Sequence, residues 1–188
     1  MARKQQNTFR IVGGTHRSRR VAFPDLPGLR PSPDRVRETV FNWLQPLMPG
    51  ARVLDLFAGS GAFGIEALSR GAASATFVEK AAPAVSAIRE ALGTLRETGE
   101  IHSGDAIAWL ESGLPRAPYD IVFVDPPYQA DLLAPAIERL AQAGWLAPEA
   151  RIYLECARDQ SLPPLPAGWE LLKDKTAGDV HYHLAAAP

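Results

Sequence analysis

From about residue 33 to residue 156, segments with a strand pattern alternate with segments with a helix pattern. Mainly apolar runs, typical of buried strands, lie at residues 52–57, 75–79, near Ile101, up to Val124, and at residues 151–156. Between them the pattern predicts helices over residues 33–47, 83–97, 106–111 and 132–143, and one from the Gly-rich turn to about Arg70. Such alternation predicts a mostly parallel sheet.

The helix over residues 33–47 has recognisable ends. We expect Ser32 to cap it and Pro33 to occupy its first turn, while Pro49-Gly50 ends it. Its apolar face is predicted to contain Val36, Val40, Phe41, Leu44 and Leu47.

The last part of the chain has a different pattern. Residues 161–168 form a proline-rich connector, and residues 169–175 and 179–185 alternate on either side of Thr176-Ala-Gly178, which predicts an antiparallel hairpin. Five strands and this hairpin predict a doubly wound α/β domain with a seven-stranded, mostly parallel, Rossmann-like sheet.

The amino-terminal part is basic. Residues 1–37 contain nine of the 20 Lys and Arg residues but only two of the 21 Asp and Glu residues, which indicates an anionic partner. Residues 9–14 and 19–23 predict a small hairpin that gathers phosphate-binding side chains: Arg10, His16, Arg17, Arg19 and Arg20. We therefore divide the chain into a basic arm with a hairpin, residues 1–32, which contacts the anionic partner, and a second domain, residues 33–188. The alternative for the arm is a solvated, partly disordered tail.

Composition and the first residues of the chain together favour a location in the cytoplasm. A chain of 188 residues with 46% hydrophobic content can bury one core, and no apolar run is long enough to span a membrane. The first seven residues are polar and basic with no apolar segment behind them, unlike a secretory signal. The single cysteine, Cys156, is expected to be a small buried hydrophobe rather than a reactive thiol.

A Gly-rich turn follows the first predicted strand of the sheet. Gly59 and Gly61 allow close approach to a ligand, and Glu79 ends the next strand, where an acid binds ribose hydroxyls. This pattern also fits a dinucleotide, but Asp55 would repel a pyrophosphate and suits the ammonium group of S-adenosylmethionine. Asp105 or the Ala106 N–H is expected to reach the adenine. The remaining expected cofactor contacts are Phe57, Ala58 and Lys80.

The fourth strand is followed by Asp125-Pro-Pro-Tyr128, at the sheet edge where open α/β folds bind ligands. The two prolines stiffen the backbone, so Asp125 and the Pro126 carbonyl can accept hydrogen bonds from an exocyclic amine while Tyr128 stacks on its base. Each residue alone also fits a structural role: Asp55 as a strand-end cap, Asp125 as a turn former and Tyr128 as a core aromatic. Their occurrence together at the ends of adjacent strands favours a functional site.

Two other kinds of site are less well supported. His181 and His183 share a strand face, but no third ligand is evident in the sequence, so we predict no metal site. No Gly-Lys-Ser/Thr follows the Gly-rich turn, which excludes a P-loop NTPase.

The motifs at residues 55–61 and 125–128 resemble those of class I amino-methyltransferases. Residues 10–14, 28–31, 34–38, 41–44 and 57–71 further resemble the RsmD-type bacterial methyltransferases, which modify N2 of a guanine in 16S ribosomal RNA of the small subunit. The likeness runs from about Phe9 to the terminal hairpin. Ser32 stands where that family usually has Thr, and Cys156 where it has a small polar residue.

The resemblance implies S-adenosylmethionine as cofactor and ribosomal RNA or an assembling 30S particle as partner. It implies catalytic roles for Asp125, Pro126, Pro127 and Tyr128. Residues 30–37 are expected to fold over the methionine end of the cofactor, with Arg30 meeting RNA and Arg35 and Arg37 meeting RNA or the cofactor carboxylate. We expect a monomer, although the sequence carries no signal for oligomeric state.

Other activities remain open from the sequence alone. The motif Asp125-Pro-Pro-Tyr128 is also found in adenine-N6 methyltransferases, whereas enzymes that methylate a glutamine amide usually have Asn first. A nicotinamide-dependent oxidoreductase and a non-catalytic RNA-binding module are more remote alternatives.

Overall fold

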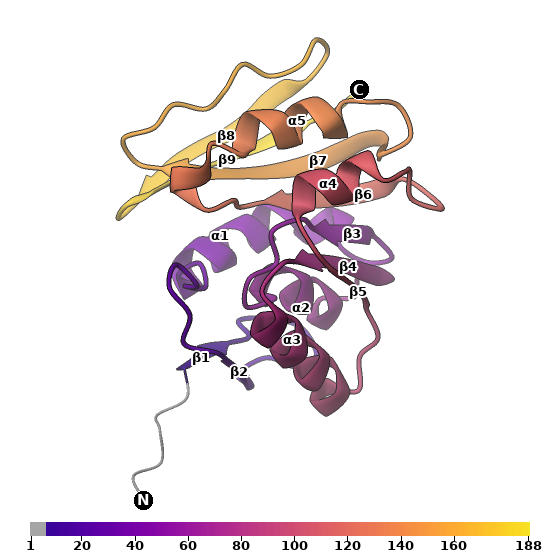
Figure 1. The fold of residues 1–188 in the computed structure, drawn as a ribbon. Coiled ribbons are helices and arrows are strands. Elements are labelled where there is room, and N and C mark those ends of the chain that lie inside the picture. The colour runs from indigo at the N-terminus through magenta and orange to yellow at the C-terminus, as the bar shows by residue number, and fades with distance from the viewer. Residues whose placement is uncertain (1–6) are drawn as a thin grey trace, which may run out of the picture.

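The computed structural model describes residues 7–188, which form a sheet covered by helices on both faces (Figure 1). The sheet strands are β3 (Arg52–Asp55), β4 (Ser74–Glu79), β5 (Glu100–Ser103), β6 (Tyr119–Val124), β7 (Leu146–Ala157), β8 (Glu170–Ala177) and β9 (Val180–Ala186). Their order is β5-β4-β3-β6-β7-β9-β8. β3 to β7 run parallel, β9 pairs antiparallel with β7, and β8 pairs antiparallel with β9 at the edge of the sheet, which confirms the predicted fold class.

The helices are α1 (Asp34–Leu44), α2 (Ala62–Ser69), α3 (Ala82–Leu95), α4 (Ala106–Glu111) and α5 (Leu133–Leu140), with short 3-10 turns η1 (Gln45–Leu47) and η2 (Tyr128–Ala130). α4 and α5 cover one face of the sheet, where Leu110 and Ile137 pack with Val122 of β6. α1, α2 and α3 lie on the other face. Because both faces are covered, the middle residues of the central strands are apolar on both faces, as in Ile121–Val124 of β6, which agrees with the continuous runs in the sequence.

The predicted amino-terminal hairpin is present as β1 (Asn7–Arg10) and β2 (Arg20–Phe23), a separate two-stranded sheet. Its side chains Phe9, Val21 and Phe23 are buried in one cluster with residues of α2 and α3. The hairpin thus shares a core with the rest of the chain, and the functional division at residue 32 stays a prediction. Residues 1–6, on which the argument about a leader sequence mainly rests, lie outside the described residues.

Two predictions about α1 are wrong. Pro33, not Ser32, occupies the N-cap position, and no side chain caps the helix. The chain also tightens into η1 after Leu44, which changes the helical phase, so that Met48 is buried and Leu47 is 45% exposed.

Elsewhere the predicted boundaries are close. β7 begins five residues before the predicted strand, and Cys156 on it is buried, as expected. Within residues 7–188, no helix has both the length and the apolar character that crossing a bilayer requires.

Candidate functional site

Three acidic residues lie at the carboxyl edge of the sheet. Asp55, the last residue of β3, is opposite Phe77 of β4 and Phe123 of β6. Glu79 follows Phe77 by two residues, and Asp125 follows Phe123 by two residues, so both reach the edge beside Asp55. The predicted adjacency of the first and fourth strands of this sheet is confirmed.

The Gly-rich loop between β3 and α2 is held against the end of β4. The Glu79 carboxylate accepts the N–H groups of Gly59 at 2.8 Å and Ala81 at 2.7 Å. Gly59 and Gly61 have φ values of +53° and +77°, a region that glycine adopts without a steric penalty. Of the other expected cofactor residues, Ala58 is buried, Phe57 is partly buried and Lys80 is exposed.

Asp55 is a buried carboxyl group beside this loop. Its Oδ2 accepts a hydrogen bond from the Gly64 N–H at 2.9 Å, and the residue is 2% exposed. Burial raises the pKa of Asp55 to about 7; the Gly64 hydrogen bond acts in the opposite direction, and the negative charge of Glu79 adds to the rise. A cationic ligand group at this position would favour the ionised carboxylate.

Asp125 is partly buried, and Ser32 Oγ donates to its Oδ2 at 3.3 Å. Burial, followed by the charge and hydrogen bond of Glu155, raises the pKa of Asp125 well above its ordinary value. Pro126 is buried and Pro127 is exposed. The motif therefore puts a carboxyl group and a stiff backbone segment at the end of β6, as the sequence predicted.

Glu155, which the sequence analysis missed, organises the side chains around Asp125. It is 3% exposed on β7 and accepts hydroxyl hydrogen bonds of 2.5 Å from both Tyr128 and Tyr153. Ser32 Oγ also lies 3.5 Å from its Oε2. The available sequence signal was an acidic residue inside an otherwise apolar strand.

The segment before α1 crosses both loops at this edge. A Cβ on Gly59 would lie 3.0 Å from Leu29 Cδ1, and Ser32 contacts Asp125. Ser32 thus brings the segment 30–37 to Asp125, and the predicted position of this segment over the methionine end of the cofactor stays a prediction. Arg30 and Arg35 are exposed.

The expected role of Arg37 in cofactor or RNA binding does not fit the structure. Arg37 is 0% exposed, and it donates to the carbonyl oxygens of Arg10 and Ser32 and to the carboxylates of Glu66 and Asp34. Its guanidinium group is enclosed by protein and binds α1, α2 and the hairpin together.

The basic side chains of the hairpin fall into two groups. Arg17, Arg19 and Arg20 are exposed, as an RNA-contacting surface requires. Arg10 instead pairs with Asp34 at 3.1 Å. His16 is partly buried and pairs at 2.7 Å with Glu97, which lies just after α3.

At the end of β5, Asp105 is the N-cap of α4. Its Oδ1 accepts the N–H groups of Ile107 and Ala108, each at 3.0 Å, and Ala106 is buried behind it. Capping fixes this carboxylate at the sheet edge, and its contact with adenine stays a prediction.

The histidine pair on β9 has a neighbour that the sequence did not reveal. Asp174 on β8 lies beside His181 and His183, and one potential ligand atom from each falls within 4.8 Å of the others. The 2.7 Å hydrogen bond between His181 and Asp174 accounts for this arrangement without an ion.

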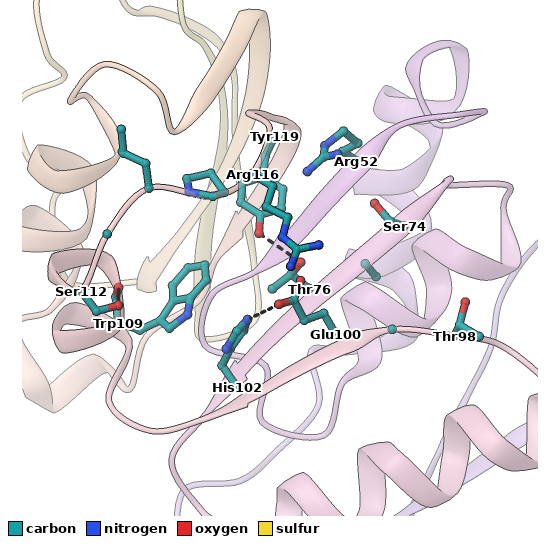
Figure 2. A pocket seen from close by; sticks show the side chains of 15 residues that line it. Arg52, Ser74, Thr76, Thr98, Glu100, His102, Trp109, Ser112, Arg116 and Tyr119 are labelled. Carbon is teal, nitrogen blue, oxygen red and sulfur yellow. Dashed lines mark hydrogen bonds and ion pairs between the residues drawn. The ribbon is translucent and has the colours of Figure 1, made fainter.

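A cavity of about 670 Å³ lies elsewhere on the molecule (Figure 2). It is lined by Arg52 and Ser74, the first residues of β3 and β4, together with Arg116 and Trp109. Because parallel strands begin at one edge and end at the other, this cavity is at the edge opposite Asp55 and is separate from the site above.

Comparison with known proteins agrees with this architecture. Residues 9–186 match the model of the family described as "Conserved hypothetical protein 95". Ribosomal RNA small subunit methyltransferase D of Escherichia coli K12 is 47% identical over 94% of this chain and 88% of its own length. The Haemophilus influenzae protein of the same name is 40% identical over 93% and 92%.

Solved structures give the same result. One from Escherichia coli is 43% identical, with a TM-score of 0.88, and covers 96% of this chain and 98% of that chain. One from Haemophilus influenzae is 38% identical, with a TM-score of 0.81 and the same coverage. These matches confirm the resemblance that the motifs indicated: the chain belongs to the family of the ribosomal RNA small subunit methyltransferase D proteins.

Proposed function

We propose that this protein transfers the methyl group of S-adenosylmethionine to the exocyclic N2 amine of a guanine in 16S ribosomal RNA. The observation that carries the proposal is the juxtaposition of the Asp55 loop and Asp125-Pro-Pro-Tyr128 at the ends of two adjacent strands. The names of the relatives support a ribosomal RNA substrate.

The residues of the first loop fit the cofactor. The buried Asp55 carboxylate suits an ammonium group, because a cation stabilises its ionised form. Glu79, fixed beside Gly59, is at the position where an acid binds ribose hydroxyls. When bound, S-adenosylmethionine supplies a methyl group activated by a positively charged sulfur.

The residues of the second motif, Asp125 to Tyr128, act on the base and its exocyclic amine. The nitrogen is a poor nucleophile because its lone pair is delocalised into the base. Asp125 and the Pro126 carbonyl accept its two hydrogens, direct the lone pair toward the methyl group and stabilise the charge that develops on nitrogen. Tyr128 stacks on the base, which must leave its helix or loop to enter the site.

The RNA binds to the β1–β2 hairpin and to residues 30–35, which follow it. Arg17, Arg19, Arg20, Arg30 and Arg35 are exposed and suit phosphate contacts. We propose that the protein acts in the cytoplasm on ribosomal RNA or an assembling small subunit, and that it does so as a monomer.

The test is mass-spectrometric mapping of methylated nucleotides. Small-subunit RNA from cells that lack this protein is incubated with the purified protein and labelled S-adenosylmethionine, then digested. We expect one labelled N2-methylguanine. Label on an adenine N6 amine would favour the alternative amino-methyltransferase activity, and absence of label from RNA would contradict the proposal.

A further inference from the structure

Asp125 and Glu155 form a carboxyl pair around one hydroxyl group. Ser32 Oγ lies 3.3 Å from Asp125 Oδ2 and 3.5 Å from Glu155 Oε2. A hydroxyl has one hydrogen, so Ser32 can donate to only one of these groups at a time. Two nearby carboxyl groups seldom ionise together, and such pairs commonly share a proton.

The groups that face this pair do not supply a neutralising charge. Tyr128 from η2 and Tyr153 from β7 donate hydroxyl hydrogens to Glu155, and burial together with the charge of Glu155 raises the pKa of both phenols. Asp55 from β3 adds negative charge near Asp125. The other neighbours are Cys156 on β7 and Tyr182, which is opposite Glu155 on β9.

The guanidinium group of Arg37, the cation that this hydrogen-bond network reaches, has other partners. Arg37 of α1 reaches the Ser32 carbonyl oxygen, and its remaining hydrogen bonds are to Glu66, Asp34 and the Arg10 carbonyl. In the part of the chain that the structure describes, neither Asp125 nor Glu155 forms an ion pair with a basic side chain.

We propose that Glu155 is a positioning residue that acts through Asp125: the two carboxyl groups share one proton, and Glu155 holds Asp125 and Tyr128 in the geometry that accepts the base amine. This inference rests on the proposed function. In the transfer step, a bond forms between the amine nitrogen and the methyl carbon as the sulfur–carbon bond breaks. One N–H bond then breaks, and its proton passes to Asp125. The pair has released its shared proton to water before this step, which leaves Asp125 ionised, and it holds one proton again afterwards.

The proposal predicts a specific change in pH dependence. Asp125 must be ionised to accept the amine hydrogens, and the neighbouring negative charge of Glu155 opposes that ionisation. Glu155→Gln removes the charge but keeps the side-chain volume and an oxygen that accepts the Tyr128 hydroxyl. We expect the acidic limb of the single-turnover rate to move to lower pH by about one unit or more.

The matched control is Glu149→Gln, the same chemical change at an exposed position on the same strand. It should leave the pH profile of methyl transfer unchanged. If Glu155→Gln lowers the rate equally at every pH, or leaves the acidic limb at the wild-type position, Glu155 has a structural role alone and the proposal is overturned.

A second measurement needs neither turnover nor a folded variant. Carbon-13 NMR of the side-chain carboxyl groups of the wild-type protein, without RNA or cofactor, should show one proton shared between Asp125 and Glu155 at neutral pH. Two independently ionised carboxylates at neutral pH would overturn the proposal. A wild-type protein that does not methylate ribosomal RNA would instead contradict the proposed function, and the NMR titration would still decide the carboxyl pair.

Discussion

Asp55 combines its proposed function in cofactor binding with a cost in stability. In an unfolded chain an Asp has a pKa of about 3.9, whereas burial raises the pKa of Asp55 to about 7. Between these values the unfolded chain gives up a proton that the folded protein keeps. Stability is therefore lost as the pH rises through this window, and the full cost is present above about pH 7.

Asp55→Asn should reverse this cost. We expect the free energy of unfolding without cofactor to rise at about pH 8, by up to about 4 kcal/mol, and to change little near pH 4. Affinity for S-adenosylmethionine should fall because the amide carries no charge. Denaturant unfolding at both pH values and calorimetric titration check the two effects. A variant that is less stable than the wild type at pH 8 would contradict this explanation.

Replacing Asp125 tests its proposed role in methyl transfer. Asp125→Ala removes one acceptor of the amine hydrogens, so single-turnover methyl transfer should fall by about 10²–10⁴-fold. Affinity for S-adenosylmethionine should stay within a few-fold of the wild type, because Asp125 is assigned to the base. Asp159→Ala, at an exposed position after β7, is the control. Normal turnover by Asp125→Ala would remove Asp125 from the mechanism.

At this scale the sequence identified residues near the ends of strands better than residues in the middle of strands. Asp55 ends β3 and Asp125 directly follows β6, so their location at one sheet edge could be predicted. Glu155 is inside β7, where the pattern says nothing about which loops its side chain reaches. Ser32 was misassigned as a helix cap because a Ser before a helix has that role often, and its actual partner is 93 residues away in the chain.

At the scale of elements, the hairpin is the proposed docking surface. Charge reversal of Arg17, Arg19 and Arg20 should weaken RNA binding and reduce the slope of log affinity against log salt by about 2–3 units, because three phosphate contacts are lost. A matched variant reverses Arg116, Lys173 and Lys175, which are exposed elsewhere on the molecule. An equal salt slope for the hairpin variant and the wild type would show that RNA docks elsewhere.

Glu66 joins the hairpin to two helices. It is 0% exposed and accepts hydrogen bonds from the Val12 N–H, Arg37 and Arg70. Glu66→Gln leaves buried positive charge without its partner, so we expect a loss of about 3–5 kcal/mol in the free energy of unfolding. Glu97→Gln, which affects the more exposed pair with His16, should cost about 1 kcal/mol or less. Denaturant unfolding compares the two, and similar losses would contradict this view of Glu66.

The same network explains why Arg37 was misread. The basic residues at the start of the chain suggested RNA or cofactor contact, but whether an arginine is exposed depends on packing between distant elements. Gly14 illustrates this packing: it has φ +77°, and a Cβ there would lie 1.8 Å from the Ser69 carbonyl oxygen at the end of α2. Neither the contacts of Arg37 nor the approach of Gly14 to Ser69 could be predicted from a local sequence pattern.

At the scale of the whole molecule, the sequence predicted which segments form the strands of the sheet. It also predicted the sheet edge at which Asp55 and Asp125 lie. Both follow from local rules: apolar runs form buried strands, and strand–helix–strand units give parallel neighbours. The shared core of the hairpin and α3 did not follow from those rules, because Phe9 and Phe23 carry no information about their partners in space. The contacts of Ser32 with Asp125 and of Arg37 with Glu66, which tie residues 10–37 to the rest of the chain, are long-range contacts of the same kind.

The most direct test of the account is a crystal structure of this protein with bound S-adenosylmethionine. The donor should lie along residues 55–61 with its ammonium group at Asp55 and its ribose at Glu79. Its methyl group should point toward Asp125, leaving room for a nucleophile at about 3–3.5 Å. A donor bound in the cavity at the opposite sheet edge, or a methyl group directed away from Asp125, would contradict it.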